Sequence, residues 1–399
     1  MSQKRVSGKS ANSVILSLFP LVLLGPLSMD MYLPALPMMQ DFFSCTTDMA
    51  QHTLSIFIFA FGVSQIFIAN LVARSGRRQV LIFSLLLFAL ASISCFFSDN
   101  IYVFLFSRLL QAFSACGSMV VTFAWINDLC HDREKSRSLF SLISATTALA
   151  PILAPVMGTL LLRYFPWQMI FILLALYSFF SLLVFLYSGP DDAGKNKSPH
   201  VSSYQKVLCS LKFWNYSIIT GGMMSFIFIY FSVSPYLLMG HFHLNQSQFS
   251  LAFAVCASGF LAGSLLSPKI QKKICLEKLI YIILFCLLIT GIILIVFSLD
   301  VTTFCTLMFF AELLFGLCFG SSVSEALSDF QEESDHASSV HGFQQFFVSS
   351  VIGFIAINLS DNNPHDFGLI MSTLSTGLLI LYHVISGMRR KRRYIEKSC

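Results

Sequence analysis

Long apolar runs constrain the fold of this chain more than any other feature of its sequence. A helix needs about 20 predominantly apolar residues to cross the hydrocarbon core of a bilayer. Only 11% of the residues are charged, far below the roughly 25% of a soluble domain. We therefore predict an all-α integral membrane protein and exclude a soluble enzyme. Twelve transmembrane helices are expected near residues 13–38, 49–72, 79–97, 101–129, 138–163, 167–188, 213–239, 248–268, 277–299, 302–325, 337–359 and 366–387.

The basic residues predict the orientation of these helices, because Lys and Arg are retained on the cytoplasmic side of short loops. With the N-terminus in the cytoplasm, every Lys and Arg except Arg108 and Arg163 falls on that side. An even number of helices also places the basic tail, which begins at Arg389, in the cytoplasm. The basic clusters are short and separated by apolar runs, so we expect no nucleic acid partner despite the net charge of +5.

One polar stretch, near residues 189–212, divides the chain. Its Gly, Pro, Ser and Lys content is typical of a solvated linker. We predict an N-terminal six-helix half at 1–190, a cytoplasmic linker at 191–212, and a C-terminal six-helix half with a basic cytoplasmic tail at 213–399. The 11 cysteines form no CxxC pair and no cluster at metal-ligand spacing, so neither a metal nor a cofactor is expected.

The first apolar run closes on the block Asp-Met-Tyr-Leu-Pro-Ala-Leu-Pro at residues 30–37. This block resembles the end of the first helix in the bicyclomycin/chloramphenicol-resistance (Bcr/CflA) group of drug:proton antiporters, which belongs to the major facilitator superfamily. Five residues depart from the usual pattern, namely Ala69, Ala73, Phe123, Asn127 and Gln168, which indicates a divergent member. Further likeness to the group or the superfamily lies at Gln51, Thr53, Leu54, Ser55, Arg74, Gly76, Arg77, Arg78, Arg108, Leu109, Gln111, Ala150, Pro151, Ala154, Pro155 and Gly158, and more weakly at Ala337, Ser338, Gly342 and Gln345.

The resemblance implies two six-helix halves that enclose a central site and alternate its access by rocking. It implies that Tyr32, Gln111 and Phe123 line the substrate cavity. It also implies gating and antiporter motifs, which comprise Arg74, Gly76, Arg77, Arg78, Pro151, Pro155 and Gly158. The prolines and the glycine of the fifth helix equally fit a simple kink with close packing, whether or not the helix moves.

Asp30 and Arg108 are the first candidates for proton coupling. A carboxylate within an apolar span is costly and usually marks an ion or substrate pathway. Asp30 lies roughly 12 Å from the outer end of the first predicted helix, and Arg108 lies roughly 10 Å from the same face. We therefore expect the two charges to share a level and to interact directly or through water. The alternatives are that Asp30 caps its helix end near Pro34 and that Arg108 is a structural tie to backbone carbonyls at the turn before the fourth helix.

Acidic residues of the second half form a further group. Glu312 lies near the middle of the tenth predicted helix, where it could receive a proton, hold a cationic substrate or remain a buried neutral acid. Glu325 and Asp329 lie one helical turn apart near the inner end of that helix. We interpret these two as a solvated helix end that pairs with the Lys-rich loop at 269–278.

These features together predict a proton-coupled exporter in the bacterial inner membrane. Its expected partners are protons, membrane lipid and a small amphipathic molecule, such as a drug, an antibiotic or a secreted metabolite like a siderophore, and we expect a monomer. An uptake symporter of the same fold is the alternative, since the same carboxylate could bring a nutrient in. A membrane enzyme or sensor is less favoured, because the sequence has no HExxH, GxSxG or Walker motif.

Overall fold

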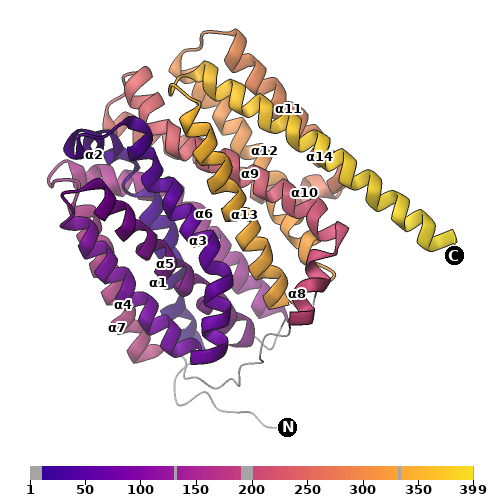
Figure 1. Ribbon diagram of the computed structural model, residues 1–399, viewed down its shortest axis with the longest axis horizontal. Coiled ribbons are helices and arrows are strands. Elements are labelled where there is room, and N and C mark those ends of the chain that lie inside the picture. The colour runs from indigo at the N-terminus through magenta and orange to yellow at the C-terminus, as the bar shows by residue number, and fades with distance from the viewer. Residues whose placement is uncertain (1–10, 130–132, 190–200, 331–333, 399) are drawn as a thin grey trace. The chain divides into compact units, whose positions relative to one another are not determined.

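A computed structural model describes residues 11–129, 133–189, 201–330 and 334–398, and every regular element in these residues is helical (Figure 1). Eleven helical stretches among them are long and apolar enough to cross a membrane. The remaining predicted span, 138–163, coincides with the 30-residue helix α6, whose side chains are described from residue 146 on. The predicted all-α membrane fold is thereby confirmed.

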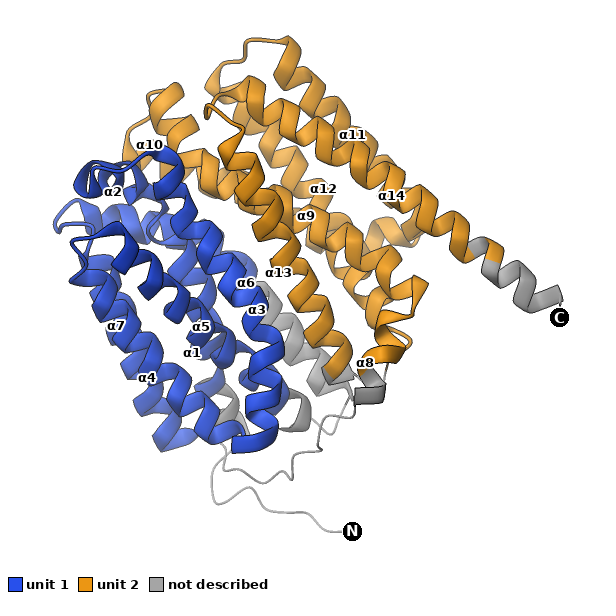
Figure 2. Cartoon of the chain, in the orientation of Figure 1, with its two compact units in different colours: residues 1–199 blue, residues 200–399 orange. Residues whose placement is uncertain are grey.

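The chain forms two compact units, residues 1–199 and 200–399 (Figure 2). Within unit 1, α1 packs against α5, α6 and α7, while α3 lies along α5 and α4 lies along α7. The elements of unit 1 are α1 (Ala11–Asp30), the 3-10 turn η1 (Leu33–Ala35), α2 (Leu36–Phe43), α3 (Thr47–Ser75), α4 (Arg77–Phe96), α5 (Ile101–Leu129), α6 (Arg133–Leu162) and α7 (Met169–Ser188).

Unit 2 repeats this packing pattern in the same chain order. Here α9 packs against α12, α13 and α14, while α10 lies along α12 and α11 lies along α14. The helices α9, α10, α12 and α14 are therefore the counterparts of α1, α3, α5 and α7. The elements of unit 2 are α8 (Val201–Leu208), which falls in the predicted linker, α9 (Leu211–Pro235), the π-helical turn η2 (Tyr236–His241), α10 (Gln246–Gln271), α11 (Leu276–Val296), α12 (Val301–Leu327), α13 (Ser334–Asn358) and α14 (Pro364–Ser398).

The first membrane span is broken, although the sequence predicted one continuous helix over 13–38. Helix α1 ends at Asp30, and the chain passes through Met31 and Tyr32 into η1 and then α2. A cause lies in Pro34, which has no N–H to donate to the carbonyl of Asp30 four residues earlier. Asp30 therefore lies at the end of a helix rather than inside one.

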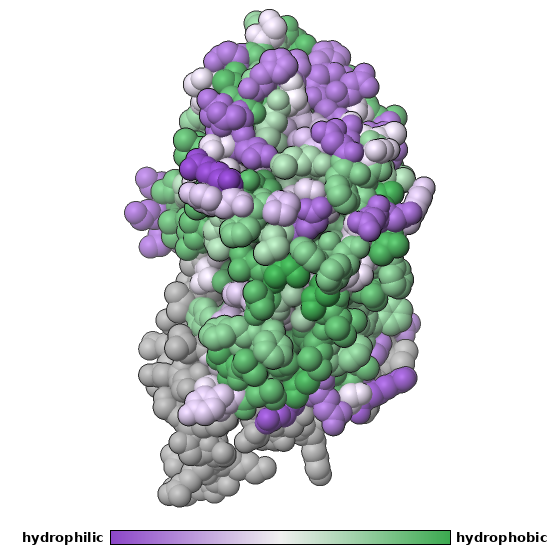
Figure 3. Space-filling model, turned by 90° about the vertical axis from the view of Figure 1, so that its left-hand side faces the viewer, coloured by the Kyte–Doolittle hydropathy of each residue, from purple (hydrophilic) through white to green (hydrophobic). Residues whose placement is uncertain are grey.

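Large apolar side chains cover the outward faces of α4 and α7, as lipid contact requires. Figure 3 shows them as a broad apolar zone, with hydrophilic side chains gathered above it and along its lower edge. The exposed side chains on these two helices include Phe83, Leu86, Leu90, Leu176, Phe179, Phe180 and Leu183.

The C-terminal end of α12 is held by a lysine from α9. The Lys212 ammonium lies 2.7 Å from an Asp329 carboxylate oxygen and 3.6 Å from one of Glu325. A hydrogen bond from Lys212 also holds the pKa of the Asp329 carboxyl below its usual range. The predicted partner, the Lys-rich loop at 269–278, was therefore wrong, because the first turn of α9 already brings a cation to this helix end.

Candidate functional site

Arg108 is the centre of a buried polar network in unit 1. Its side chain is 0% exposed, and its Nη1 donates to the Ser28 carbonyl oxygen at 3.0 Å and to the Gln111 Oε1 at 2.5 Å. The last carbonyls of a helix lack intrahelical donors and carry partial negative charge. Arg108 on α5 therefore acts as a cationic cap on the last turn of α1.

The network continues from Arg108 into a third helix, α4. The Gln111 Nε2 donates to the Ser92 Oγ at 2.7 Å, and the Ser92 hydroxyl donates to the Phe88 carbonyl at 2.7 Å. Gln111 and Ser92 each accept a hydrogen bond from the preceding residue in this series and donate one to the next, so α1, α4 and α5 are joined by hydrogen bonds at one level. Gln111, predicted to line a substrate cavity, has its amide bonded at both ends to the protein.

Aromatic rings enclose the Arg108 guanidinium. Its Cζ lies 4.4 Å from the ring centroid of Phe57, 4.5 Å from that of Tyr32 and 6.0 Å from that of Phe171. The Nε and Nη2 atoms have no hydrogen-bond acceptor among the described residues. The electron-rich faces of the aromatic rings attract the guanidinium in place of an acceptor. We call Arg108, Tyr32, Phe57 and Phe171 the arginine cage.

Tyr32 is held in this cage by its hydroxyl. The Thr53 hydroxyl donates to the Ala50 carbonyl at 2.6 Å, so at 3.1 Å the Tyr32 Oη is the donor and the Thr53 Oγ1 the acceptor. Tyr32 is fully buried. Like Gln111, it is bonded within the helix bundle of unit 1.

Asp30 lies two residues beyond the carbonyl that Arg108 caps, and its side chain is only 2% exposed. Among the described residues no hydrogen bond or ion pair joins Asp30 to Arg108. Arg108 is tied to a backbone carbonyl, but the carbonyl is that of Ser28 in α1 and not one at the turn before the fourth span, where the alternative had placed it. The direct contact expected between the two charges is absent, because the guanidinium points at Ser28 and Gln111 instead.

Gly158 of α6 lies directly against the segment that follows Asp30. A Cβ at this position would meet the Met31 carbonyl oxygen at 1.9 Å, so only glycine permits the observed approach. Pro155 and Pro151 lie about one and two turns earlier in α6, where each removes a backbone donor. The predicted motif of the fifth span therefore packs beside the break in the first.

Gly76 forms the junction between α3 and α4 in the predicted basic loop. Its backbone φ of 85° lies in a region that favours glycine, and α4 begins at the next residue. Arg74 is exposed near the end of α3, while Arg77 and Arg78 are half-buried in the first turn of α4. The Arg78 Cζ lies 6.0 Å from the ring centroid of Phe185 on α7.

Phe123 and Glu312, two predicted site residues, are not part of the arginine cage. Phe123 is half-buried on α5, 15 residues beyond Arg108, which is roughly 22 Å along a helix. Glu312 is 5% exposed on α12 of unit 2. Sequence reasoning in turn missed Ser28, Phe57, Ser92 and Phe171, because no local pattern separates these from the many other Ser and Phe residues of the spans.

We expect Arg108→Lys to lower both stability and transport. Lysine keeps the charge but loses the planar fork that bonds two acceptors while it stacks on rings. The loss of a charged hydrogen bond and the stranding of the buried Gln111 Oε1 should cost about 2 kcal/mol. Thermal unfolding of the purified protein in detergent measures this cost, with the exposed Arg163→Lys as the matched control. Wild-type stability and transport in Arg108→Lys would contradict the role assigned to the fork.

The architecture described so far, two repeated bundles of membrane-length helices with a buried acid beside a capped helix end, is that of a secondary transporter. The sequence profile of the Major Facilitator Superfamily matches residues 18–357. The chain therefore belongs to this superfamily and is a multi-pass membrane transporter rather than an enzyme.

Named relatives lie among drug-resistance proteins. A chloramphenicol resistance protein of Pseudomonas aeruginosa is 33% identical over 264 residues, which are 64% of this chain and 62% of that protein. The multidrug resistance protein MdtL of Shewanella sp. (strain ANA-3) is 28% identical over 381 residues, which are 92% of this chain and 93% of that protein. These relatives confirm the resemblance found in the first and fifth helices.

Solved structures of other transporters share the fold. The crystal structure of the peptide transporter POT in complex with sulfate superposes with a TM-score of 0.75 at 12% identity and covers 98% of both chains. The crystal structure of a D-xylose-proton symporter gives a TM-score of 0.72 at 12% identity and covers 92% of this chain and 97% of that one. At this identity the two structures establish the fold alone.

Proposed function

We propose that this transporter exports a small amphipathic molecule in exchange for protons by alternating access. The observation that carries the proposal is the buried carboxylate of Asp30 at a broken helix end, beside a buried arginine. A carboxylate in an apolar span is expensive unless it serves an ion or substrate pathway. Helix α1 and Gly158 of α6 meet at this break, so movement of either helix would change the surroundings of Asp30.

In this proposal Asp30 exchanges the proton. Burial of a carboxylate favours its neutral form, whereas water or a nearby cation favours its charged form. A state in which Asp30 is sealed would therefore hold the proton, and a state in which it meets water or the Arg108 guanidinium would release it. Arg108 acts as a fixed positive charge, while Tyr32 and Gln111 hold it in place.

Two observations support export over uptake. The residues Ala150, Pro151, Ala154, Pro155 and Gly158 resemble the fifth-helix motif of antiporters. The two relatives reported above are resistance proteins by name. The cargo we infer is a drug or antibiotic, because the chain has few buried charges and many Phe and Met side chains. No observation favours a siderophore.

We also place the protein in the bacterial inner membrane with both termini in the cytoplasm. The support for this orientation is the distribution of Lys and Arg, which leaves Arg108 and Arg163 as the exceptions. The basic loop with Arg74, Gly76, Arg77 and Arg78 is then cytoplasmic and serves as the gate motif that the resemblance implies.

The test uses inverted membrane vesicles, whose cytoplasmic face points outward, and radiolabelled chloramphenicol as the probe. We expect an acidic lumen to drive chloramphenicol inward against the outward flow of protons, and a protonophore to cancel this uptake. Vesicles that lack the protein give the background. If an imposed proton gradient drives drug and protons in the same direction, the uptake symporter replaces the exporter as the proposal.

A further inference from the structure

Helices α10 and α12 of unit 2 pack along each other with their backbones in contact. A Cβ on Gly259 of α10 would overlap the Phe309 carbonyl oxygen of α12, and a Cβ on Gly263 would overlap that of Leu313. The contacts advance by about one turn on each helix, so the two helices run in the same direction. Small residues allow this close approach of helix backbones within a membrane.

Two cysteines face each other one turn before the first of these contacts. Cys256 precedes Gly259 by three residues, and Cys305 precedes Phe309 by four. The Cys256 thiol donates to the Cys305 carbonyl oxygen at 3.5 Å, and the two thiols also interact with each other. A disulfide requires Cα atoms about 4.4–6.8 Å apart. Helices in backbone contact bring facing residues to such a separation, so the packing of α10 and α12 favours a disulfide at this pair.

The two thiols differ in access. Cys305 is half-buried near the start of α12, whereas Cys256 is 0% exposed. In thiol–disulfide exchange one thiolate attacks the oxidant and a second thiolate then displaces the adduct. Cys305 is therefore placed to attack an oxidant, and Cys256 is placed to displace the adduct from Cys305.

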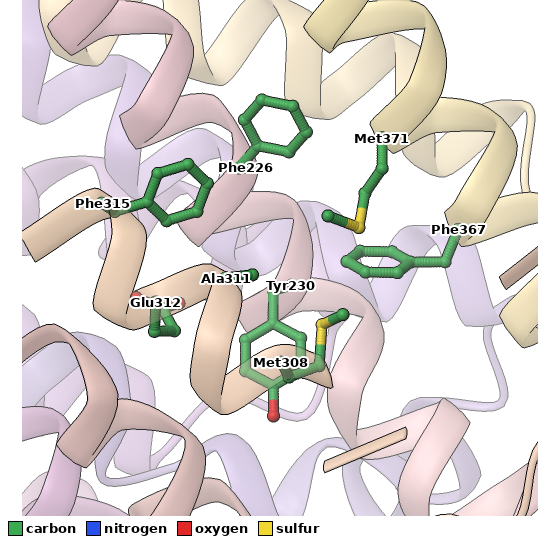
Figure 4. A pocket seen from close by; sticks show the side chains of 8 residues that line it. All are labelled: Phe226, Tyr230, Met308, Ala311, Glu312, Phe315, Phe367 and Met371. Atoms are coloured by element: carbon green, nitrogen blue, oxygen red, sulfur yellow. The ribbon is translucent and has the colours of Figure 1, made fainter. Parts of the chain in front are cut away.

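The Tyr230 hydroxyl of α9 is a third polar group at this pair. It interacts with the Cys256 thiol, and Figure 4 shows that it points away from the rings of Phe226 and Phe315. The thiolate is the reactive form of cysteine, and a charged group in an apolar interior is costly unless a donor reaches it. Tyr230 supplies a donor to the Cys256 sulfur when that sulfur carries negative charge.

Packing alone does not account for two thiols in contact. A single buried thiol behaves as a small apolar side chain, as Cys318 does where its sulfur lies 3.6 Å from that of Met223. At the start of α12, by contrast, an accessible thiol faces a buried one beside a hydroxyl. In the orientation proposed above, this end of α12 lies toward the periplasm, which is an oxidising compartment.

We propose that Cys256 and Cys305 form a reversible redox site, which a disulfide compound oxidises to a disulfide that links α10 to α12. The Cys305 thiolate attacks one sulfur of the oxidant and releases the first thiol. The Cys256 thiolate then attacks the Cys305 sulfur of the mixed disulfide and releases the second. Two electrons pass from the cysteines to the oxidant, and the two cysteine protons end on the released thiols. Only access from the periplasm rests on the orientation proposed above, whereas the chemistry of the pair does not depend on transport.

The experiment treats the purified full-length protein in detergent with 4,4′-dithiodipyridine, a small disulfide. We expect peptide mass spectrometry to find Cys256 joined to Cys305, and a phosphine reductant to restore both thiols. Cys286→Ser changes a half-buried cysteine of α11 and is the matched control, which should form the same link as the wild type.

Two further variants test the order of the steps. Cys256→Ala should accumulate the thiopyridine adduct on Cys305, and Cys305→Ala should leave Cys256 unreacted. Both variants should unfold near the wild-type temperature, because alanine is also small enough for the contact between α10 and α12. The proposal is overturned if the wild type keeps the adduct on Cys305 beside a free Cys256 thiol, or if neither cysteine reacts. Chloramphenicol transport has no bearing on either result, so failure of the redox site and failure of the proposed function are distinguishable.

Discussion

Asp30→Asn should abolish proton-driven export while leaving the protein folded in the membrane. Asparagine has the size and shape of aspartate but no titratable group, so the substituted site cannot take up or release a proton. Because a neutral amide avoids the cost of a buried charge, we expect thermal stability equal to or above that of the wild type. Chloramphenicol uptake by inverted vesicles should fall to the level reached with a protonophore.

The matched control is Asp41→Asn, which changes an exposed carboxylate on the neighbouring helix α2. It should transport like the wild type. Substrate binding separates coupling from recognition, since Asp30→Asn should still bind chloramphenicol when no gradient is imposed. Full uptake by Asp30→Asn with an unchanged dependence on pH would exclude Asp30 as the coupling residue.

The helices of this protein follow from its sequence because lipid imposes a simple requirement. Backbone groups in the bilayer core must be satisfied within the chain, so each apolar run of sufficient length becomes a helix, as α3, α4 and α7 show. The break after Asp30 was not predicted, because apolar residues continue on both sides of it. Pro34 was the available signal, but Pro20 and Pro26 lie inside α1 without ending it.

The candidate site was predictable only in part. Asp30 and Arg108 stand out because charges are rare in apolar spans, and their similar depth suggested that they meet. The hydrogen-bond partners of Arg108 depend on which way its side chain points. No local sequence pattern indicates that direction. Ser28 accepts the hydrogen bond from Arg108 through its backbone carbonyl. Every residue carries this group, so the residue type could not have predicted the contact.

Gly158→Ala should disrupt the junction between α6 and the break in α1. The added methyl would lie 1.9 Å from the Met31 carbonyl oxygen and 3.0 Å from its carbon. These are backbone atoms, so no rotamer change relieves the clash and the helices must separate. Overpacking of this kind costs about 1–3 kcal/mol, and the shift displaces the segment that carries Asp30. We expect lower thermal stability together with a large loss of export.

The control for this effect is Gly377→Ala in α14, where an added Cβ would meet nothing within 4 Å. Alanine is a better helix former than glycine by about 1 kcal/mol, so Gly377→Ala should be neutral or stabilising. If Gly158→Ala lowers thermal stability and Gly377→Ala does not, the difference would identify the contact with Met31 as the cause of the loss. Thermal unfolding in detergent and chloramphenicol uptake by inverted vesicles provide the two readouts. Gly158→Ala with wild-type stability and uptake would show that α6 can move away from Met31 freely, and the link between the fifth-helix motif and Asp30 would then be lost.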